Sequence, residues 1–340
     1  MPRQHASDFE AVLAGALVVA RRPETGETLV GAARFVILDA WTAAIVAPAF
    51  SELSRFAAAA RAAGTKLPVA IVLGGDPAYA VLGAAPLPPR LDAWTFAGWL
   101  RGAPVELSND GPSGCAIPAD AEIVIEGTIS GDEPPNLVPP IRYVESTGEM
   151  YDVPLEDRLL LRISTISHRS SPLVPLVRIG SSEEELLRRA AVSLGRAWIK
   201  TEVPELTGLS IPGFGGPRGF VFAAFQKRRP FHARRVAAAL FAQSWLDSAY
   251  IVLVDSDVDV HNPDQVWAQV ARFADPARDL IAFDAPPQPF SPTRRLAIDA
   301  TRKTSAERDR ASPSSPASPA ELVKRVQDRW WEYGLGAPPK

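Results

Sequence analysis

Residues 250–278 read YIVLVDSDVDVHNPDQVWAQVARFADPAR, and this stretch decides the fold class. Residues 251–254 form a short, mostly β-branched apolar run of the length that one fully buried strand needs. Three aspartates follow within residues 255–259, and Asn262 or Asp264 can then cap a helix. Strand, acidic turn and helix in this order predict an α/β domain, in which ligands gather at the carboxyl end of such a strand.

Length and composition exclude several classes of protein. A chain of 340 residues is long enough for two domains with cores of their own. Its net charge of −3 offers no general attraction to nucleic acid or to anionic membranes. The one cysteine, Cys115, rules out an internal disulfide and a cysteine-based zinc site, as is typical of a reducing compartment. We find no apolar run of membrane-spanning length and no signal pattern, so we expect a cytoplasmic protein.

Clusters of proline mark the expected boundaries between segments of the chain. There are 33 of them, about twice the usual share. They cluster in residues 86–89, 134–140, 286–292 and 313–319. The last cluster lies in the polar segment SPSSPASPAE, which is typical of a linker that cannot fold by itself.

The first half of the chain reads as short strands with helices between them. Apolar runs and the turn signal PETGE in residues 11–48 indicate a β-meander, and the alanine-rich residues 51–63 indicate a helix. Further strands are expected at residues 69–73, at residues 123–125, where the strand ends in Glu126-Gly127, and at residues 159–168. This mixture favours a mixed sheet or split barrel over a doubly wound parallel fold.

A glycine pair, Gly74-Gly75, stands between the strand at 69–73 and a helix that Asp76-Pro77 can open. Such a turn can bring backbone N–H groups close to a phosphate. It can equally be a tight strand-to-helix turn, which is the interpretation we favour, because the full spacing of a dinucleotide or P-loop motif is absent.

Residues 181–200, SSEEELLRRAAVSLGRAWIK, predict a long amphipathic helix that links two domains. Ser181 or Ser182 can cap it, and three glutamates occupy its first turn, where the helix dipole favours negative charge. Another strand, within residues 217–229, is followed by a helix with Val236, Leu240 and Trp245 toward the core, and this helix leads into the stretch quoted first.

Ten short segments stand in the order in which one known family carries them. They are RRPETGETLVGAARF, LPVAIVLGGDPA, AGWLRGAPVEL, IPADAEIVIEG, ISTISHR, FQKRRPFHARR, YIVLVDSDVDV, VWAQVARFADPARD, IDATRK and RWWEYGL. In this order they resemble the UbiD-like decarboxylases, named for the 3-octaprenyl-4-hydroxybenzoate carboxy-lyases. The resemblance covers the chain from about Pro23 to Leu335, and it depends on the joint order, since no single segment is specific.

The resemblance implies a mixed α/β architecture in five parts. They are a split β-barrel that binds the cofactor (1–170), a linker helix (171–200), a C-terminal α/β oligomerisation domain (201–300), a Pro/Ser linker (301–320) and a tail helix (321–340). The domain that usually precedes the barrel in this family is expected to be missing.

The resemblance also implies a reaction. Such enzymes hold prenylated FMN (prFMN), usually with a divalent metal such as Mn and with potassium, and reversibly decarboxylate aromatic or α,β-unsaturated acids. The difficult chemistry belongs to the cofactor, which a flavin prenyltransferase would supply. A homodimer, or a hetero-oligomer with a homologous subunit, is the expected assembly.

Two catalytic roles carry over to this sequence. The family's arginine near the flavin and the substrate carboxylate falls on Arg34, and its catalytic glutamate falls on Glu185. A shift of one residue in the alignment would select Glu184, and a shift of two would select Glu183. Such enzymes need both groups, because the carboxylate must be bound and the product carbon protonated.

Three further residues are expected near the cofactor. The family's metal-site glutamate falls on Glu133, with Glu126 as the alternative. A lysine that faces the flavin is replaced by Arg295, which keeps the charge and changes its shape.

Departures from the family pattern concentrate on the metal. The asparagine that ligates it aligns with Leu29, and the histidine aligns near Ala49 or Ser51. None of these can donate a lone pair in the same way, so we expect metal and potassium binding to be weakened or lost. The family's EGPFGE segment is represented by NLVPPIRY.

Simpler interpretations exist for each of these residues. Arg34 can be a surface charge, and the three glutamates at 183–185 are explained by the helix dipole alone. The four histidines show no metal spacing and are interpreted as structural.

Three functions therefore remain open. The first is a prFMN decarboxylase that has shed its metal or binds the cofactor unusually. The second is a non-catalytic UbiD-like subunit that assembles with a complete homologue, which Leu29 and the short N-terminus favour. The third takes Asp255, Asp257 and Asp259 as the metal site of a glycosyltransferase, for which no sugar-nucleotide framework is visible.

Overall fold

The computed structural model describes most of the chain between residues 12 and 334. The segments outside the described residues are 1–11, 49–50, 85, 88–90, 131–137, 145–149, 176–181, 213–218, 244, 247, 285–293, 308–319 and 335–340. Residues 1–301 form one compact unit, and residues 302–340 form a second one.

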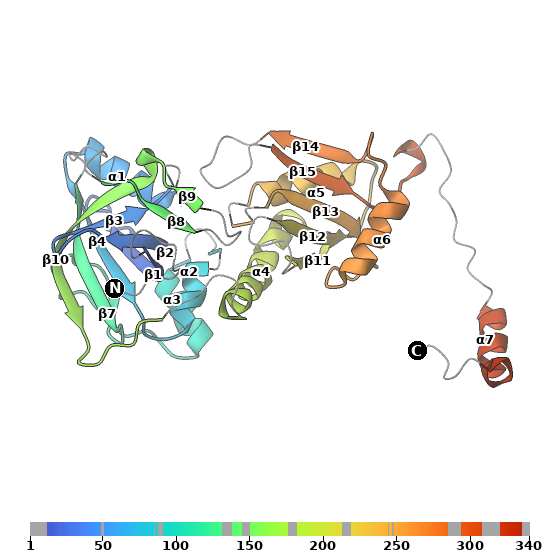
Figure 1. Cartoon of the computed structure of the whole chain (residues 1–340), viewed down its shortest axis with the longest axis horizontal. Coiled ribbons are helices and arrows are strands. Elements are labelled where there is room, and N and C mark those ends of the chain that lie inside the picture. The colour runs from blue at the N-terminus through green and yellow to red at the C-terminus, as the bar shows by residue number, and fades with distance from the viewer. Residues whose placement is uncertain are drawn as a thin grey trace. The chain divides into compact units, whose positions relative to one another are not determined.

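Six strands of the larger unit close into an antiparallel barrel, in the order β1-β2-β3-β10-β7-β4 (Figure 1). The strands are β1 (Val12–Arg21), β2 (Thr28–Ile37), β3 (Thr42–Val46), β4 (Lys66–Leu73), β7 (Ile123–Ser130) and β10 (Arg158–His168). The meander expected in residues 11–48 is confirmed as β1, β2 and β3, and the barrel closes where β1 pairs with β4. The expected barrel is therefore present, and it is closed.

Alternation along each strand divides the barrel into an inner and an outer face. On β4, Leu67, Val69 and Ile71 belong to the inner core, whereas Ala70 and Val72 belong to an outer cluster. Helix α1 (Glu52–Ala62), capped by the Ser51 hydroxyl, adds to the inner core. Helices α2 (Ala78–Ala84) and α3 (Ala93–Arg101) cover part of the outer face.

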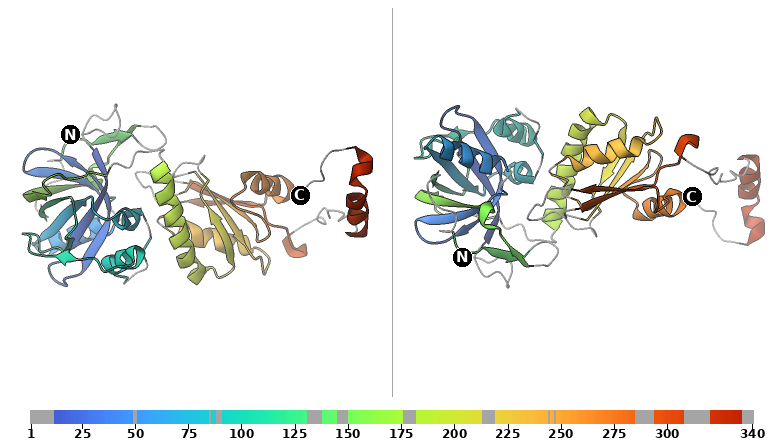
Figure 2. Two further views of the ribbon diagram at one scale, coloured as in Figure 1. Left: turned by 90° about the horizontal axis from the view of Figure 1, so that it is seen from below. Right: turned by 90° about the horizontal axis from the view of Figure 1, so that it is seen from above.

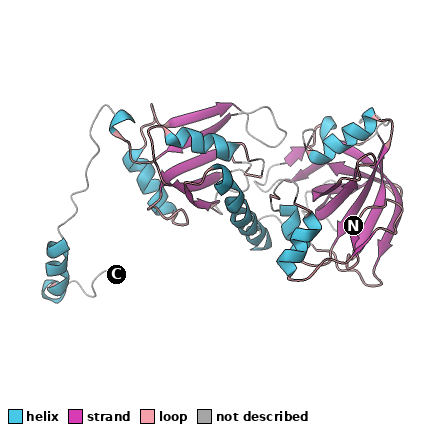
Figure 3. Cartoon of the chain, turned by 180° about the vertical axis from the view of Figure 1, so that it is seen from behind, coloured by secondary structure: helices cyan, strands magenta, loops and turns pink. Residues whose placement is uncertain are grey.

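Smaller elements fill the connections of the barrel (Figure 3). Two short ribbons are formed by β5 (Leu107–Ser108) with β6 (Ile117–Pro118) and by β8 (Arg142–Val144) with β9 (Met150–Asp152). A 3-10 turn, η2 (Leu155–Asp157), precedes β10.

Strand β7 is longer than the sequence predicts. The expected strand ended at Glu126-Gly127, but pairing continues to Ser130. Gly127 stays in the ladder because β10 carries an irregularity between Ile163 and Thr165. The β10 backbone comes so close that a Cβ on Gly127 would lie 2.0 Å from the carbonyl oxygen of Arg162. The glycine is thus a packing requirement and not a strand end.

A five-stranded sheet forms the second half of the larger unit, in the order β11-β12-β13-β15-β14. Its strands are β11 (Leu206–Ser210), β12 (Phe220–Phe225), β13 (Tyr250–Asp255), β14 (Leu280–Asp284) and β15 (Arg294–Asp299). The three central strands β12, β13 and β15 are parallel, and the two edge strands are antiparallel to them. The α/β domain expected from residues 250–278 is confirmed.

Helices cover both faces of this sheet (Figure 2). Helices α4 (Ser182–Glu202) and α5 (His232–Phe241) pack on one face, where Ile199, Leu240 and Leu253 share a core. Helix α6 (Pro263–Phe273) packs on the other face through Val266. The Asn262 side chain caps α6 as predicted, by accepting from the backbone N–H groups of Asp264 and Gln265. The helix predicted to reach Trp245 ends at Phe241, although Trp245 still packs against the core.

The smaller unit contains η4 (Ser305–Glu307), α7 (Ala320–Asp328) and η5 (Trp330–Tyr333). The helix predicted for the tail begins one residue earlier than expected. Across the described part of the chain, helices are all too short or too polar to span a membrane.

Candidate functional site

Arg34 lies on β2 with its side chain on the outer face of the barrel. It stands directly opposite Val46 of β3, and Val46 and Val36 both belong to an outer apolar cluster. Arg34 itself is half-buried and takes part in further interactions within the protein. Arg34 therefore stands next to apolar surface on the outer face of the barrel, and its catalytic role stays a prediction.

Glu126 lies on β7, on the same outer face but on the far side of the barrel. Between β2 and β7 stand two strands in either direction, β3 and β10 or β1 and β4. Glu126 faces the same way as Ala70, which lies directly opposite it and belongs to the outer cluster beneath α2 and α3. The structure therefore does not bring Arg34 and Glu126 together.

The carboxylate of Glu126 holds a loop onto the barrel. It is 4% exposed and accepts hydrogen bonds from the Ser113 hydroxyl (2.6 Å) and the Ser113 backbone N–H (3.2 Å). Gly111 of the same loop passes so close that a Cβ would lie 2.3 Å from a Glu126 oxygen. A buried carboxylate needs such donors, so Glu126 is a tether for the loop around residues 111–115.

Two of the glutamates that the resemblance selects as catalytic lie in a described helix. Glu184 and Glu185 belong to the first turn of α4, but their side chains lie outside the described residues. Glu133 also lies outside the described residues. Their roles stay predictions.

Arg295, expected to face the flavin, lies on β15 at 7% exposure. One of its Nη atoms donates to the Phe241 carbonyl oxygen at 3.2 Å, and the guanidinium carbon lies 5.9 Å from the centre of the Phe241 ring. Part of this arginine's role is thus to join β15 to the end of α5.

The described residues that align with the family's metal ligands make contacts within the protein instead. Leu29 of β2 packs against the inner core of the barrel, and Ser51 caps α1 by accepting from the Ser54 N–H at 3.2 Å. Ala49 lies outside the described residues. Among the described residues, no three His, Cys, Asp or Glu side chains gather in a way that could hold a metal ion.

The glycine pair after β4 forms a tight turn. Gly74 and Gly75 have φ values of 75° and 112°, and a Cβ on Gly74 would lie 2.7 Å from the Leu173 carbonyl oxygen. Asp76 accepts from the Ala78 N–H and pairs with Arg101 at 3.1 Å. These contacts are the ones that the tight-turn interpretation requires.

Polar side chains gather at the carboxyl ends of the parallel strands. The Lys227 ammonium donates to the Thr301 hydroxyl (3.1 Å), which in turn donates to Asp299 at the end of β15 (2.5 Å). Asp255 ends β13 and is 9% exposed. Because these groups bond to one another, they stabilise the edge where an open α/β sheet commonly binds ligands.

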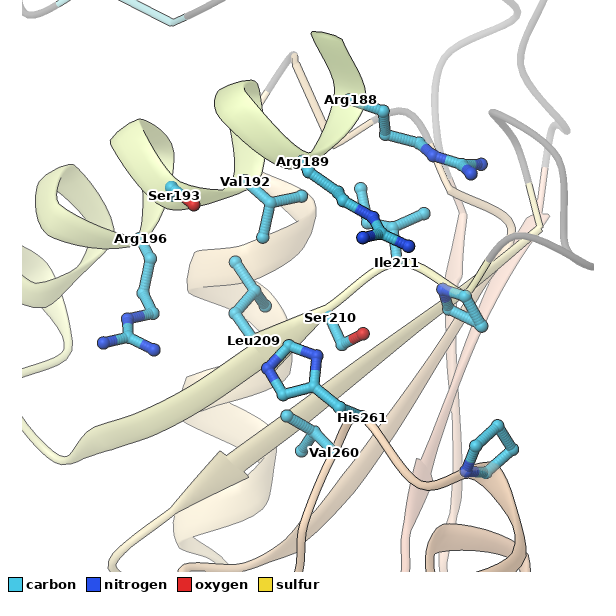
Figure 4. Close-up of a pocket in the computed structure, with 12 residues that line it drawn as sticks. Arg188, Arg189, Val192, Ser193, Arg196, Leu209, Ser210, Ile211, Val260 and His261 are labelled. Carbon is cyan, nitrogen blue, oxygen red and sulfur yellow. The ribbon is translucent and has the colours of Figure 1, made fainter. Parts of the chain in front are cut away.

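Sequence reasoning missed a pocket beside α4 (Figure 4). Its volume is about 620 Å³, and it lies between α4, β11 and the segment after β13. Arg188, Arg189 and Arg196 of α4 line it together with His261. The spacing of arginines along the predicted helix was the available signal, but the strand that faces them could not be identified from the sequence.

Two further titratable side chains, His232 and Cys115, are buried. His232 at the start of α5 is 2% exposed, and burial lowers its pKa despite Glu205 at 4.0 Å. Cys115 is 1% exposed, and burial raises the pKa of its thiol. The interpretation of His232 as structural agrees with its position.

Family models match nearly the whole described chain. The 3-octaprenyl-4-hydroxybenzoate carboxy-lyase Rift-related domain matches residues 1–182, and the C-terminal domain of the same family matches residues 185–302. An uncharacterized protein of Aeropyrum pernix is 32% identical over 79% of this chain and 57% of its own length. One of Synechocystis is 28% identical over 98% of this chain and 68% of its own length. The chain thus spans between about half and two thirds of these relatives.

Solved structures share the fold. Vanillic acid decarboxylase of Sedimentibacter hydroxybenzoicus in its closed form gives a TM-score of 0.82 at 21% identity, covering 98% of this chain and 72% of that one. An evolved dimeric form of the UbiD-class enzyme HmfF from Pelotomaculum thermopropionicum, in complex with prFMN, gives 0.74 at 23%, covering 95% and 71%. With both domain models matched in order on a barrel and an α/β sheet, the chain belongs to the UbiD family of 3-octaprenyl-4-hydroxybenzoate carboxy-lyases.

Proposed function

We propose that the chain is a decarboxylase that acts reversibly on an aromatic or α,β-unsaturated carboxylic acid with prFMN as its cofactor. The observation that carries this proposal is the match of both family domains, in order, over residues 1–302. Solved proteins of the same fold include one in complex with prFMN and one that decarboxylates vanillic acid.

Arg34 fits a flavin or a substrate carboxylate. The residue is half-buried on the same face of the barrel as Val36 and Val46, so it stands next to apolar surface on which a ring system can lie. A guanidinium donates paired hydrogen bonds to a carboxylate or a phosphate, and such bonds are stronger away from bulk water. When bound, prFMN supplies the electrophilic centre that takes up the electrons left as CO2 departs.

The chain's own residues would then bind the acid and move one proton. Arg34 would hold the substrate carboxylate in place until CO2 leaves. Glu185, or its neighbour Glu184, would protonate the product carbon from the first turn of α4. Arg295 would contribute positive charge from β15. Because Glu126 is already bonded to Ser113, we assign it the tether and no catalytic step.

The described residues do not fit a divalent metal at the positions the family comparison selects. Leu29 has no donor atom and packs into the barrel core, and the Ser51 hydroxyl caps α1. We therefore derive no step through a metal or potassium ion. Glu133 remains the candidate ligand if a metal is bound.

A second candidate is a non-catalytic subunit that assembles with a complete homologous decarboxylase. The observation that favours it is Leu29, which offers core packing where the family comparison expects a ligand. A cytoplasmic location and assembly as a homodimer or hetero-oligomer are proposed for either candidate. Supply of the cofactor by a flavin prenyltransferase belongs to the decarboxylase.

The test is to produce the protein with and without a flavin prenyltransferase and to measure its absorbance and its turnover of a panel of aromatic and α,β-unsaturated acids. A decarboxylase should show bound flavin and release CO2 only after production with the prenyltransferase. Arg34→Gln should lower kcat/KM by at least about a hundredfold, and Arg34→Lys should recover part of the loss, because charge returns without the planar fork.

Matched controls separate chemistry from folding. Arg55→Gln removes an exposed barrel-side arginine and should leave turnover within about twofold, because its ion pair with Glu52 is long at 3.9 Å and solvated. Glu185→Gln compared with Glu184→Gln identifies the proton donor. A protein without flavin or turnover that co-elutes with a longer homologue and raises that homologue's activity would replace the first proposal by the second.

A further inference from the structure

The pocket beside α4 has the dimensions of a ligand site. Its volume of about 620 Å³ lies within the range of roughly 300–1,000 Å³ that is typical of small-molecule sites. Its walls come from α4, from β11 with the residues that follow it, and from the segment that joins β13 to α6 (Figure 4). None of Arg34, Glu126 and Arg295 is among the residues that line it, and Glu184 and Glu185 stand one helical turn before Arg188 and Arg189 on α4.

Positive charge dominates one wall of the pocket. Arg189, Ser193 and Arg196 are spaced i, i+4 and i+7, which places them on one face of α4, and Arg188 extends the row. The described lining residues include no carboxylate. Between Arg189 and Arg196 the helix rises by roughly 10 Å, so the charge extends over two turns. Such a row of positive charge attracts an anion.

The floor of the pocket is apolar, and its opposite wall is polar. Val192 and Ile211 are partly exposed and line the floor beside the buried Leu209 and Val260, and Val192 of α4 points toward Leu209 (Figure 4). Ser210 of β11 and His261 add a hydroxyl and an imidazole across from the arginines. A bare inorganic ion would leave the floor unmatched, whereas an organic anion would cover it.

The number of donors favours a phosphate group over a carboxylate. A phosphate monoester brings nearly two charges and three acceptor oxygens, whereas a carboxylate brings one charge and two oxygens. Three guanidinium groups with five N–H donors each exceed what one carboxylate can use. Arg188 and Arg189 hold interactions within the protein, and the five N–H donors of a guanidinium allow a ligand to be bound alongside such contacts.

We propose that this pocket binds a small organic phosphate ester, with its phosphate on the arginines of α4 and its organic part over Val192 and Ile211. The site goes beyond the proposed decarboxylation and does not depend on it. It adds a ligand of a chemical class that neither the flavin nor the acid substrate supplies at this position.

Calorimetric titration of the full-length protein with three phosphate esters tests the proposal. The probes are adenosine 5′-monophosphate, glucose 6-phosphate and phenyl phosphate, with inorganic phosphate and glutarate as comparison ligands. At least one ester should bind, and it should bind more tightly than either comparison ligand. The double variant Arg189→Gln/Arg196→Gln should raise the Kd of that ester by at least about tenfold, because two charge-assisted contacts are lost.

Lys200→Gln is the matched control. It removes an exposed positive charge from the same helix, one turn beyond Arg196 and outside the pocket, and it should change the Kd by less than about twofold. Ser193→Glu provides a second variant that keeps helix propensity and adds a negative charge to the exposed wall, so it should weaken binding as the double variant does.

The readout is binding, so it separates this proposal from the decarboxylase activity. A protein without turnover that still binds a phosphate ester would support the pocket and not the enzyme. Failure of all three esters to bind, equal affinity for inorganic phosphate, tighter binding of glutarate, or affinity unchanged in both variants would each overturn the proposal.

Discussion

The barrel and the five-stranded sheet bury their β-strands in different ways. Each barrel strand has an inner and an outer face, and β10 shows it, since Leu159, Leu161 and Ile163 are buried while Leu160 and Arg162 between them are partly or fully exposed. In the sheet, β13 is buried on both faces from Ile251 to Asp255, because α5 and α6 cover opposite sides. The barrel therefore depends on close approach between strands, and the sheet depends on its covering helices.

The largest effect is expected from a methyl group added where barrel strands meet. Gly127→Ala should destabilise the protein by about 3 kcal/mol, because the new Cβ would lie 2.0 Å from the backbone oxygen of Arg162 and the strand cannot easily move. Gly31→Ala on β2 is the matched control. Nothing lies within 4 Å of its added Cβ, so stability should rise by about 0.5 kcal/mol. Urea unfolding measures both, and equal effects would refute the role given to close approach.

Removal of a helix cap should lower the stability of the protein by an intermediate amount, both in the barrel region and in the sheet region. Asn262→Ala removes the acceptor for the Asp264 and Gln265 N–H groups of α6, and Asp92→Ala removes the acceptor for the Thr95 N–H of α3. Each substitution should cost about 1 kcal/mol. Thermal unfolding measures the loss, with Asn262→Asp as a variant that keeps the cap. A cost near zero for α6 would show that the sheet does not depend on this covering helix.

A smaller change in stability is expected when the pH is lowered, and it arises from a histidine in the sheet region. Burial lowers the pKa of His232, so the unfolded chain binds more protons than the folded one just below pH 6.5. Stability should therefore fall as the pH drops from about 7 to 5.5. His232→Gln should flatten the stability curve in this window. The pKa of Glu205 is also lowered, but its contribution is lost only at lower pH, near the ordinary range of a glutamate. A steeper curve in the variant would contradict this account.

The smallest effect is expected at Cys115. Its sulfur lies 3.6 Å from the Val19 carbonyl oxygen, and burial raises the pKa of the thiol. A thiol reagent should therefore label the native protein on the order of a hundredfold more slowly than the urea-unfolded protein. Rapid labelling without denaturant would show that the barrel opens around this residue far more often than its packing suggests.

Local sequence patterns were sufficient to predict most elements. The run at residues 251–254 predicted β13, and Asn262 predicted the start of α6, because burial and capping leave direct signatures in neighbouring residues. The irregularity in β10 left no such signature. Gly127 was interpreted as a strand end, since the carbonyl oxygen that requires a glycine there belongs to a strand some thirty-five residues away.

The candidate site could be predicted only in part. The resemblance selected Arg34, and the structure gives it an outer, half-buried position that no local pattern indicates. It also selected Glu126, which the closed strand order places on the far side of the barrel and Ser113 engages. The arginines of α4 were visible in the sequence, but a pocket requires knowledge of β11, whose five residues carry little pattern.

The closed strand order of the barrel has a consequence for how this part of the molecule opens. Because β1 pairs with β2 on one side and, at residues 17–20, with β4 on the other, this part of the strand is held along both of its margins. It cannot peel away as a sheet margin frays, since release breaks two ladders at once. Exchange of the amide protons of residues 17–20 with solvent should thus require concerted rupture, which makes them some of the slowest-exchanging in the described chain.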